Sequence, residues 1–427
     1  MIEEKKVGYK QTDIGIIPED WNVKYLGDLA NFYKGKFLPK SNISYSGKFK
    51  CIHYGELFTH YKEKIKDIRY KTNQPLNISF LSKSNDVLMP TSDVTPNGLA
   101  KASCVLEDNL ILGGDILVIR MKEQAKLNGV FLSYFIRLHK DEIMKRISGT
   151  TVYHLYASDI KDLLVHFPEI EEQNSIVSAL MDIDGLINSL EELIVKKRNM
   201  KKAAIQKLVT GEKRIPGFCA KWEKSPLEDL ANFYKGKFLP KSNISYSGKF
   251  KCIHYGELFT HYKEKIKDIR YKTNQPLNIS FLSKSNDVLM PTSDVTPNGL
   301  AKASCVLEDN LILGGDILVI RMKEQAKLNG VFLSYFIRLH KDEIMKRISG
   351  TTVYHLYASD IKDLLVHFPE IEEQNSIVSI LEDMSEEIEI IEHRLVKANS
   401  MKAGMMHDLL SGKTRLCQTN IQKEFAS

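Results

Sequence analysis

Apolar and polar positions in the first part of the chain predict a globular fold that mixes short strands with helices. Four short apolar runs bounded by Gly, Asp or Pro have the composition of strands, at residues 49–57, 86–90, 102–107 and 111–121. Apolar residues at helical spacing occur at 129–148 and 158–165. Polar loops rich in hydroxyl and amide groups separate these elements, at 91–101 and 148–158. The pattern predicts a fold of the α+β class.

A second pattern begins after Pro168, where apolar residues recur at alternating spacings of four and three, as in the seam of a coiled coil. Acidic residues at the start and the pairs Thr210-Gly211 and Ser411-Gly412 at the end predict two helices, at 169–211 and 370–412. Each would be about 60 Å long at 1.5 Å per residue. The predicted seams comprise Ile176, Leu180, Ile183, Ile187, Leu190 and Ile194 in the first helix, and Ile377, Leu381, Met384, Ile388, Ile391 and Leu395 in the second.

The chain contains one segment twice. Asp28–Ser178 recurs without a difference as Asp229–Ser379, at an offset of 201 residues. A period of this length is the size of a whole domain with its connector, far longer than a solenoid repeat. The two copies must therefore share one fold and one binding specificity.

These elements predict two globular mixed α/β domains, 1–168 and 212–369, alternating with the helices 169–211 and 370–412 and followed by a tail, 413–427. The helices can pair with each other antiparallel, giving an intramolecular coiled coil with an approximate two-fold axis between two identical heads. Alternatively, each helix packs on its own head, or both pair with another protein. We favour intramolecular pairing because the connector 212–227 is short.

Composition excludes several classes of protein. With 43% apolar and 27% charged residues, the chain is neither disordered nor collagen-like. No apolar run approaches the roughly 18 residues of a membrane span, and residues 1–21 lack the apolar stretch of a signal peptide. The six cysteines form no CxxC pair, which favours free thiols over structural zinc. We expect a cytoplasmic protein without a membrane partner.

Charge within each copy is uneven. Residues 28–71 hold 10 basic and 4 acidic side chains, whereas 72–178 hold 10 and 13. A basic segment interleaved with tyrosines is compatible with a surface that faces nucleic-acid phosphates. A solvated lysine-rich face is the competing interpretation, and charge alone does not decide between them.

Catalytic motifs are missing from the sequence. It has no P-loop, since SGKT at 411–414 lacks the upstream glycine, and no GxGxxG, HExxH or GxSxG motif. The Asn-Pro-Pro-aromatic tetrapeptide of amino-methyltransferases is also missing, and the histidines are scattered. An enzyme is therefore disfavoured, and we expect neither a metal nor a cofactor in this chain.

Several segments resemble Type I restriction–modification specificity subunits. IPEDWNVKYLGDLA at 17–30 and RIPGFCAKWEKSPLEDLA at 214–231 are similar to the openings of the two halves of that family. FPEIEEQ at 167–173, followed by a long helix, is similar to the end of its recognition domain. The resemblance covers nearly the whole chain, in the order recognition domain, helix, recognition domain, helix.

The resemblance implies a non-catalytic subunit that reads double-stranded DNA. It implies two modification subunits as partners, which bind S-adenosylmethionine and methylate adenine, and restriction subunits, which use ATP and Mg. Typical members carry two different recognition domains and read an asymmetric split site. Two identical domains related by a two-fold axis predict instead an interrupted palindrome.

Candidate DNA contacts fall into two groups. Lysines are candidates for phosphates, with solvated surface as the competing interpretation: Lys34, Lys36, Lys40, Lys62 and Lys64, and their copies Lys235, Lys237, Lys241, Lys263 and Lys265. Two polar loops are candidates for base edges: Ser92, Asp93, Thr95 and Asn97 in one, Thr150, Thr151, Tyr153 and His154 in the other, with copies Ser293, Asp294, Thr296, Asn298, Thr351, Thr352, Tyr354 and His355. Turn formation by Asp, Pro and Gly explains part of the first loop without DNA.

Two other functions remain open. A coiled-coil adaptor that joins proteins would also combine heads, helices and no catalytic motif, but it would lack salt-dependent DNA binding. An unrecognised nuclease or methyltransferase would show activity as the purified chain alone.

Overall fold

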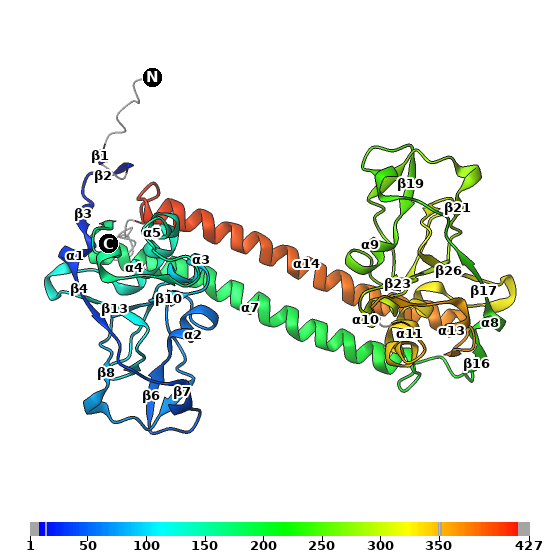
Figure 1. Ribbon diagram of the computed structural model, residues 1–427, viewed down its shortest axis with the longest axis horizontal. Helices are drawn as coiled ribbons and strands as arrows, with labels where there is room; N and C mark the ends of the chain where they lie inside the picture. The colour runs from blue at the N-terminus through cyan, green and yellow to red at the C-terminus, as the bar shows by residue number, and fades with distance from the viewer. Residues whose placement is uncertain (1–7, 13–14, 349, 351, 417–427) are drawn as a thin grey trace, which may run out of the picture. The chain divides into compact units, whose positions relative to one another are not determined.

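The computed structural model describes residues 8–12, 15–348, 350 and 352–416. The described residues form two compact units: one from those within 1–190 and 394–427, the other from those within 191–393. Each unit contains one globular head, residues 8–167 or 222–368, and parts of two long helices (Figure 1). The first unit is discontinuous in sequence, whereas the second is a single stretch.

The first head is built on two sheets. One is antiparallel with strand order β11-β9-β13-β4, and the other has the order β5-β7-β6-β12-β8 with one parallel pair, β6 and β12. Three further antiparallel pairs are β1-β2, β3-β15 and β10-β14. The strands are β1 Tyr9–Thr12, β2 Gly15–Pro18, β3 Asn22–Tyr25, β4 Ala30–Lys34, β5 Ile43–Ser44, β6 Phe49–Ile52, β7 Tyr70–Thr72, β8 Phe80–Leu81, β9 Val87–Pro90, β10 Ser92–Asp93, β11 Ser103–Cys104, β12 Ile111–Leu112, β13 Ile116–Met121, β14 Tyr153–His154 and β15 Leu164–Phe167.

Short helices complete the first head. α4 is the most buried of them, because its apolar residues face the four-stranded sheet and the long helices at once; its side chains from Val130 to Ile136 are all buried. The helices are α1 Leu26–Leu29, α2 Tyr54–Thr59, α3 Pro96–Leu99, α4 Gly129–Leu138, α5 Lys140–Met144 and α6 Ala157–Ile160, with 3-10 turns η1 Lys40–Asn42, η2 Leu76–Ile78 and η3 Glu123–Ala125.

The second head repeats these elements from β3 onward, and its described residues contain no counterpart of the β1–β2 pair. Its strand pairings and registers follow those of the first, as the identical sequence requires. Its elements are β16 Glu223–Pro226, α8 Leu227–Leu230, β17 Ala231–Lys235, η4 Lys241–Asn243, β18 Ile244–Ser245, β19 Phe250–Ile253, α9 Tyr255–Thr260, β20 Tyr271–Thr273, η5 Leu277–Ile279, β21 Phe281–Leu282, β22 Val288–Pro291, β23 Ser293–Asp294, α10 Pro297–Leu300, β24 Ser304–Cys305, β25 Ile312–Leu313, β26 Ile317–Met322, η6 Glu324–Ala326, α11 Gly330–Leu339, α12 Lys341–Met345, β27 Tyr354–His355, α13 Ala358–Ile361 and β28 Leu365–Phe368.

Two of the local predictions are corrected by the structure. The run 49–57 is a strand only as far as Ile52, because His53 and Glu56 form a capping box that starts α2. The run 158–165 is helical only at its beginning, because Leu164–Phe167 pairs with Asn22–Tyr25 as a strand. In both cases apolar spacing alone could not show which partner the backbone would find.

The two predicted long helices are confirmed as α7 (Ile170–Val209) and α14 (Ile371–Leu410), each of 40 residues. Gly211 and Gly412 follow them with φ of 75° and 70°, the left-handed conformation that ends a helix. No helix in the described part of the chain combines the length and apolar character needed to cross a lipid bilayer.

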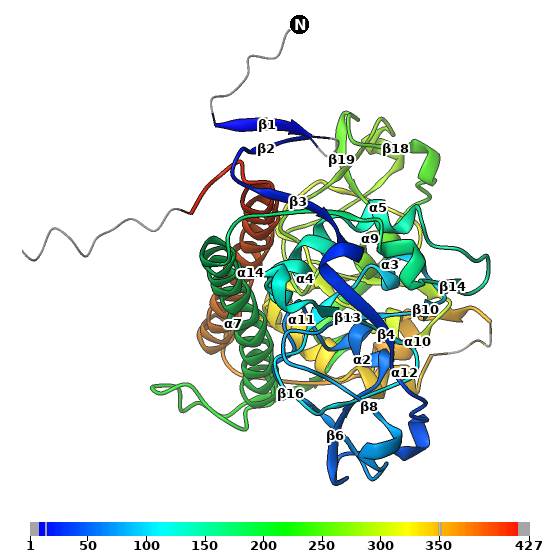
Figure 2. The same ribbon diagram turned by 90° about the vertical axis from the view of Figure 1, so that its left-hand side faces the viewer.

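Within each unit α7 and α14 run antiparallel, as predicted (Figures 1 and 2). In the first unit, Ile183 and Ile187 of α7 form an apolar cluster with Leu395 and Ala398 of α14. In the second, α7 and α14 are joined by ion pairs, Lys197–Glu387 and Arg198–Glu392, each at 2.5 Å. Both units thus combine apolar and ionic contacts between the helices, since the first also has the ion pair Lys402–Asp184 at 2.8 Å and the second buries Ile194, Ile388 and Ile391.

The predicted seam residues divide between two tasks. Ile176 and Leu180 lie in the core of the first head, and Ile377 and Leu381 lie in the core of the second. Met384 packs against the second core, whereas Leu190 packs against the apolar interhelical cluster. The remaining seam positions, Ile194, Ile388 and Ile391, are buried.

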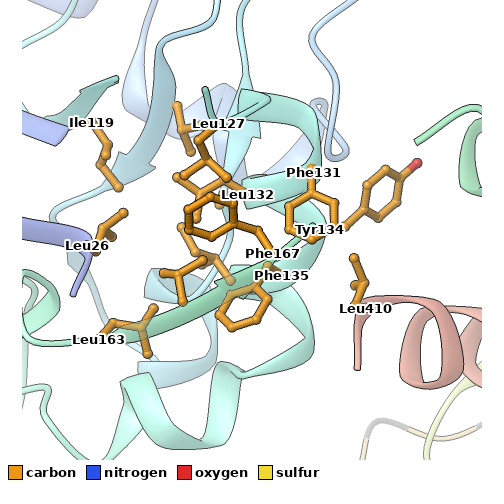
Figure 3. Close-up of a cluster of buried hydrophobic side chains, with 14 of the residues drawn as sticks. Leu26, Ile119, Leu127, Phe131, Leu132, Tyr134, Phe135, Leu163, Phe167 and Leu410 are labelled. Atoms are coloured by element: carbon orange, nitrogen blue, oxygen red, sulfur yellow. The ribbon is translucent and has the colours of Figure 1, made fainter. Parts of the chain in front are cut away.

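Each head core also receives the end of the helix that comes from the other half of the sequence. Met406, Leu409 and Leu410 of α14 join the core of the first head, where Figure 3 shows Leu410 beside the α4 residues Tyr134 and Phe135. Leu208 and Val209 of α7 join the core of the second head in the same way. The first core is therefore completed by residues more than 200 positions beyond Leu180, whereas the α7 residues that join the second core shortly precede its own Trp222 in sequence.

An arginine after each long helix fixes this arrangement. Arg415 donates two hydrogen bonds to the Glu172 carboxylate, both at 2.7 Å, and two to Asp20, both at 2.8 Å. These bonds lower the pKa of Asp20. Arg214 binds the fully buried Glu373 in the same bidentate manner, at 2.7 and 2.6 Å. The planar guanidinium suits such paired contacts better than a lysine would.

His166 of β15 makes a further contact with the returning helix. Its Nε2 lies 2.8 Å from the carbonyl oxygen of Leu410, and the ring is 4% exposed. Burial lowers its pKa to about 4, and the nearby His139 adds to the effect. Its copy His367 is exposed, so identical sequence gives different environments in the two heads.

We expect His166 to make the first unit sensitive to acid. Its pKa is about 6.5 in an unfolded chain, so folding favours the neutral ring. This contribution is complete above about pH 6.5 and is lost as the pH falls toward 4; at pH 5 the loss is roughly 2 kcal/mol of unfolding free energy. Urea unfolding of His166→Gln at pH 7 and pH 5 should show a smaller pH dependence than the wild type.

His367→Gln is the matched control and should keep nearly the wild-type pH dependence. Equal pH profiles for the wild type and His166→Gln would show that His166 does not carry this effect.

Candidate nucleic-acid interface

The structure brings the two candidate base-reading loops together. Ser92–Asp93 (β10) pairs antiparallel with Tyr153–His154 (β14), in the register Ser92 opposite His154. Both loops therefore form one surface, although about 50 residues of sequence separate them. Tyr354 and His355 pair with Ser293 and Asp294 in the second head.

Asp93 has a structural partner inside its own loop. Its carboxylate accepts hydrogen bonds from the Val94 N–H at 2.7 Å and from the Thr95 hydroxyl at 2.9 Å. A side chain at Gly98 would begin 1.8 Å from the same carboxylate, so glycine is required there. Asp93 and Thr95 thus shape the loop, which supports the turn interpretation for these two residues. In the second head, Val295 and Thr296 donate the same hydrogen bonds to the Asp294 carboxylate.

Other residues of this surface are exposed. Asn97, Thr150 and Thr151 are exposed to solvent, and Thr352 is exposed in the second head. Thr351 lies outside the described residues, and so does the side chain of Asn298.

Two exposed side chains of this surface were missed by the sequence analysis. Tyr156 is 55% exposed and stacks on His154 with ring centroids 6.1 Å apart. Val94 is 71% exposed at the tip of the first loop. Exposed aromatic and apolar side chains suit stacking and contact with thymine methyl groups. Their local sequence pattern gave no sign that they would be exposed.

The lysines fall into two groups. Lys34, Lys36 and Lys40 are exposed; Lys34 ends β4, and the other two follow in the next six residues. The backbone there is held by close contact, because a Cβ at Gly35 would lie 2.0 Å from the Gly113 carbonyl oxygen. Lys34 lies 3.8 Å from Asp115, and both side chains are at least half exposed, so their pairing is weak. Exposed Phe37 lies among these lysines and was also missed.

Lys62 and Lys64 lie elsewhere, along a groove between the first head and α7. Lys62 donates a hydrogen bond to the Asn188 amide oxygen at 2.7 Å, and both lysines line the groove with Met181. Their copies lie against α14 and are ion-paired, Lys263 with Glu389 at 3.2 Å and Lys265 with Glu382 at 2.7 Å. The copies of Lys34, Lys36 and Lys40, namely Lys235, Lys237 and Lys241, are exposed like the originals.

The buried cysteines and the possible metal-binding side chains offer little support for catalysis. Burial raises the pKa of the Cys51 and Cys104 thiols to about 12, so neither is a ready nucleophile. Among the described residues, His, Cys, Asp and Glu nowhere form a group of three or more that could hold a metal ion.

Comparison with known proteins identifies the family. Residues 18–197 and 220–400 each match the family described as the Type I restriction modification DNA specificity domain. The chain belongs to this family and carries its domain twice. It is a specificity subunit with two target recognition domains.

Relatives of similar length support this assignment. The chain is 22% identical to the Type I restriction enzyme MjaVIII specificity subunit of Methanocaldococcus jannaschii, over 97% of this chain and 98% of that protein. It is 23% identical to the putative MjaX specificity subunit of the same organism, over 96% and 98%.

The fold is also similar to solved structures. The S subunit of a Type-I restriction-modification system from M. genitalium matches with a TM-score of 0.59 and 16% identity, covering 94% of this chain and 97% of that one. A chain from a study of assembly and conformational transition in the type I R-M system matches with a TM-score of 0.57 and 16% identity, covering 93% and 99%.

Two substitutions in the first head should separate phosphate contacts from base contacts. Lys34→Ala should weaken binding to all sequences alike and reduce the slope of log affinity against log salt by about one, the value for one lost phosphate contact. Asn97→Ala should instead lose about 1–3 kcal/mol of discrimination at one base pair of one half-site. Fluorescence anisotropy against a panel of single-base variants at several salt concentrations measures both.

The corresponding changes in the second head, Lys235→Ala and Asn298→Ala, serve as matched comparisons. Equal losses across all sequences for the lysine and the asparagine variants would contradict this assignment of roles.

Proposed function

We propose that this chain reads a bipartite DNA site in which both halves have the same sequence on opposite strands, an interrupted palindrome. The observation that carries the proposal is the exact duplication of the β10–β14 surface as β23–β27, with the same register and the same internal hydrogen bonds. Two identical surfaces recognise identical bases. An interrupted palindrome requires the two half-sites to be read in opposite orientations.

In this proposal, residues 1–168 and 212–369 are the two recognition domains. Residues 169–211 and 370–412 are the spacer helices, and 413–427 form a tail. In the first recognition domain, the candidates for base edges are Asn97, Thr150, Thr151 and His154. Their copies 201 residues later are the candidates in the second domain. The exposed lysines Lys34, Lys36 and Lys40 are the candidates for phosphates. Phosphate contacts set the position of the protein, whereas base contacts determine the sequence read.

We further propose that the chain acts in the cytoplasm, without catalysing a reaction itself. Its partners are two modification subunits, which use S-adenosylmethionine to methylate adenine, and restriction subunits, which use ATP and Mg. Membership of the specificity family supports these partners. The complex, and not this chain, would therefore be the adenine methyltransferase and the endonuclease.

Mapping of methylated adenines tests the proposed site. Co-expression with a cognate modification subunit, followed by single-molecule sequencing of the host DNA, should give one split palindromic motif with N6-methyladenine in both halves. The motif should be missing when this chain is omitted. An asymmetric or directly repeated motif would contradict the two-fold arrangement, and a stable complex without any motif would favour a protein adaptor.

The two long helices should determine the gap between the half-sites. One heptad inserted into the middle of both α7 and α14 keeps the apolar side chains on the same faces and adds about 10 Å. The methylated motif should then gain about three base pairs of unspecified sequence at 3.4 Å per pair. Seven residues inserted into the connector after Gly217 are the control and should leave the gap unchanged; an unchanged gap in both variants would exclude the helices as the spacer.

A further inference from the structure

The two identical heads lie against helices of unlike sequence. In the first unit, the segment from His60 to Arg69 faces Met181, Asp184 and Asn188 of α7 across the groove described above. In the second unit, the identical segment from His261 to Arg270 faces Glu382, Ser385 and Glu389 of α14. The exact repeat ends at Ser178 and Ser379, just before these helix residues. Differences between the two grooves therefore come from the helices alone.

In the second unit, glutamates of α14 neutralise the lysines on the rim of the groove. Lys265 lies 2.7 Å from Glu382, and both side chains are about three-quarters buried. Lys267 lies 3.3 Å from Glu386 and 4.0 Å from Glu389.

In the first unit, the corresponding helix positions carry no acid. Met181 stands where the second unit has Glu382, Gly185 where it has Glu386, and Asn188 where it has Glu389. Lys64 and Lys66, the copies of Lys265 and Lys267, form no ion pair with any other described residue. Lys64 was among the lysines selected from the sequence, whereas Lys66 was not.

The extra carboxylate of the first groove does not offset this difference. Asp184, where the second unit has Ser385, binds Lys402 at 2.8 Å and accepts a hydrogen bond from the Tyr134 hydroxyl at 2.5 Å. Lys402 also binds Glu63 at 2.8 Å. Burial alone would raise the pKa of Glu63, but Arg137 and Lys402 lower it overall. Asp184 thus belongs to a buried, paired cluster beneath the rim.

We propose that Lys64 and Lys66 form a DNA phosphate-binding site on the first recognition domain, and that the second domain lacks this site because its own lysines are held by α14. The inference rests on the proposed function, and it specifies how two domains that read the same bases differ in their hold on the backbone. A lysine that binds a carboxylate must leave it before binding phosphate, and the glutamates repel the phosphate as well. The first domain therefore releases more counterions and holds its half-site at higher salt.

The salt dependence of binding tests this asymmetry. The full chain in complex with its modification subunit is titrated with a duplex that carries two identical half-sites, at several KCl concentrations. Lys64→Gln with Lys66→Gln should reduce the slope of log affinity against log salt by about two, which is about 0.9 per lost phosphate contact. Lys265→Gln with Lys267→Gln is the sequence-identical control and should change the slope by much less than one.

Exchange of the helix residues gives a second test that leaves the lysines in place. Gly185→Glu with Asn188→Glu imports the acids of the second unit, and a side chain at Gly185 meets no atom within 4 Å. This variant should lower the slope by about one, because Lys66 gains partners. Glu386→Gln with Glu389→Gln should raise the slope by a similar amount, because Lys267 is released.

Equal effects of the two lysine pairs, or a slope that no helix substitution changes, would overturn the inference. If the wild-type complex bound the duplex with two half-sites no more tightly than a duplex without them, the result would instead contradict the proposed function. Circular dichroism melting curves show whether each variant remains folded.

Discussion

The fold depends on the completion of each head by the far end of a helix that belongs to the other half of the sequence. Met406, Leu409 and Leu410 enter the core of the first head, and burying each such side chain contributes roughly 1.5–3 kcal/mol. The bidentate bonds from Arg415 to Glu172 and Asp20 then fix the direction of the chain beyond α14. Without the end of α14 in this core, Ile176 and Leu180 would lose part of the apolar surface that covers them. The antiparallel course of the helices and the burial of His166 follow from the same constraint.

Exact duplication does not make the two heads equivalent. The residues that differ lie outside the repeat, yet they change the environment of residues inside it. His166 is buried against the Leu410 carbonyl, whereas His367 is exposed. The Tyr134 hydroxyl donates a hydrogen bond to Asp184 of α7, whereas its copy Tyr335 has Ser385 of α14 as the corresponding neighbour. The β10–β14 surface of a head lies wholly within the repeat, while the charge and stability of the head also depend on the helices it contacts.

The heads and the long helices could be predicted from the sequence, whereas several local features depend on contacts that no local pattern encodes. A repeat of 151 identical residues and two runs of heptad spacing define heads and helices without reference to any partner. The capping box at His53 and Glu56 replaced part of an expected strand, because a side-chain contact decided between two backbone states. The pairing of Ser92–Asp93 with Tyr153–His154 could not be predicted, since no local pattern encodes contact between distant loops. The exposure of Phe37 and Tyr156 likewise depends on which neighbours fail to cover them.

The discontinuity of the first unit has a consequence for biosynthesis. A ribosome completes the first head's own sequence early, but the side chains that close its core, Met406 to Leu410, come more than 200 residues later. At about 5–20 residues per second, that delay is roughly 10–40 s. The second unit is one continuous stretch that has all of its core residues before α14 ends. The head that is translated first is therefore the last to obtain its full core, and a chain released before Met406 leaves the apolar surface of the first head open.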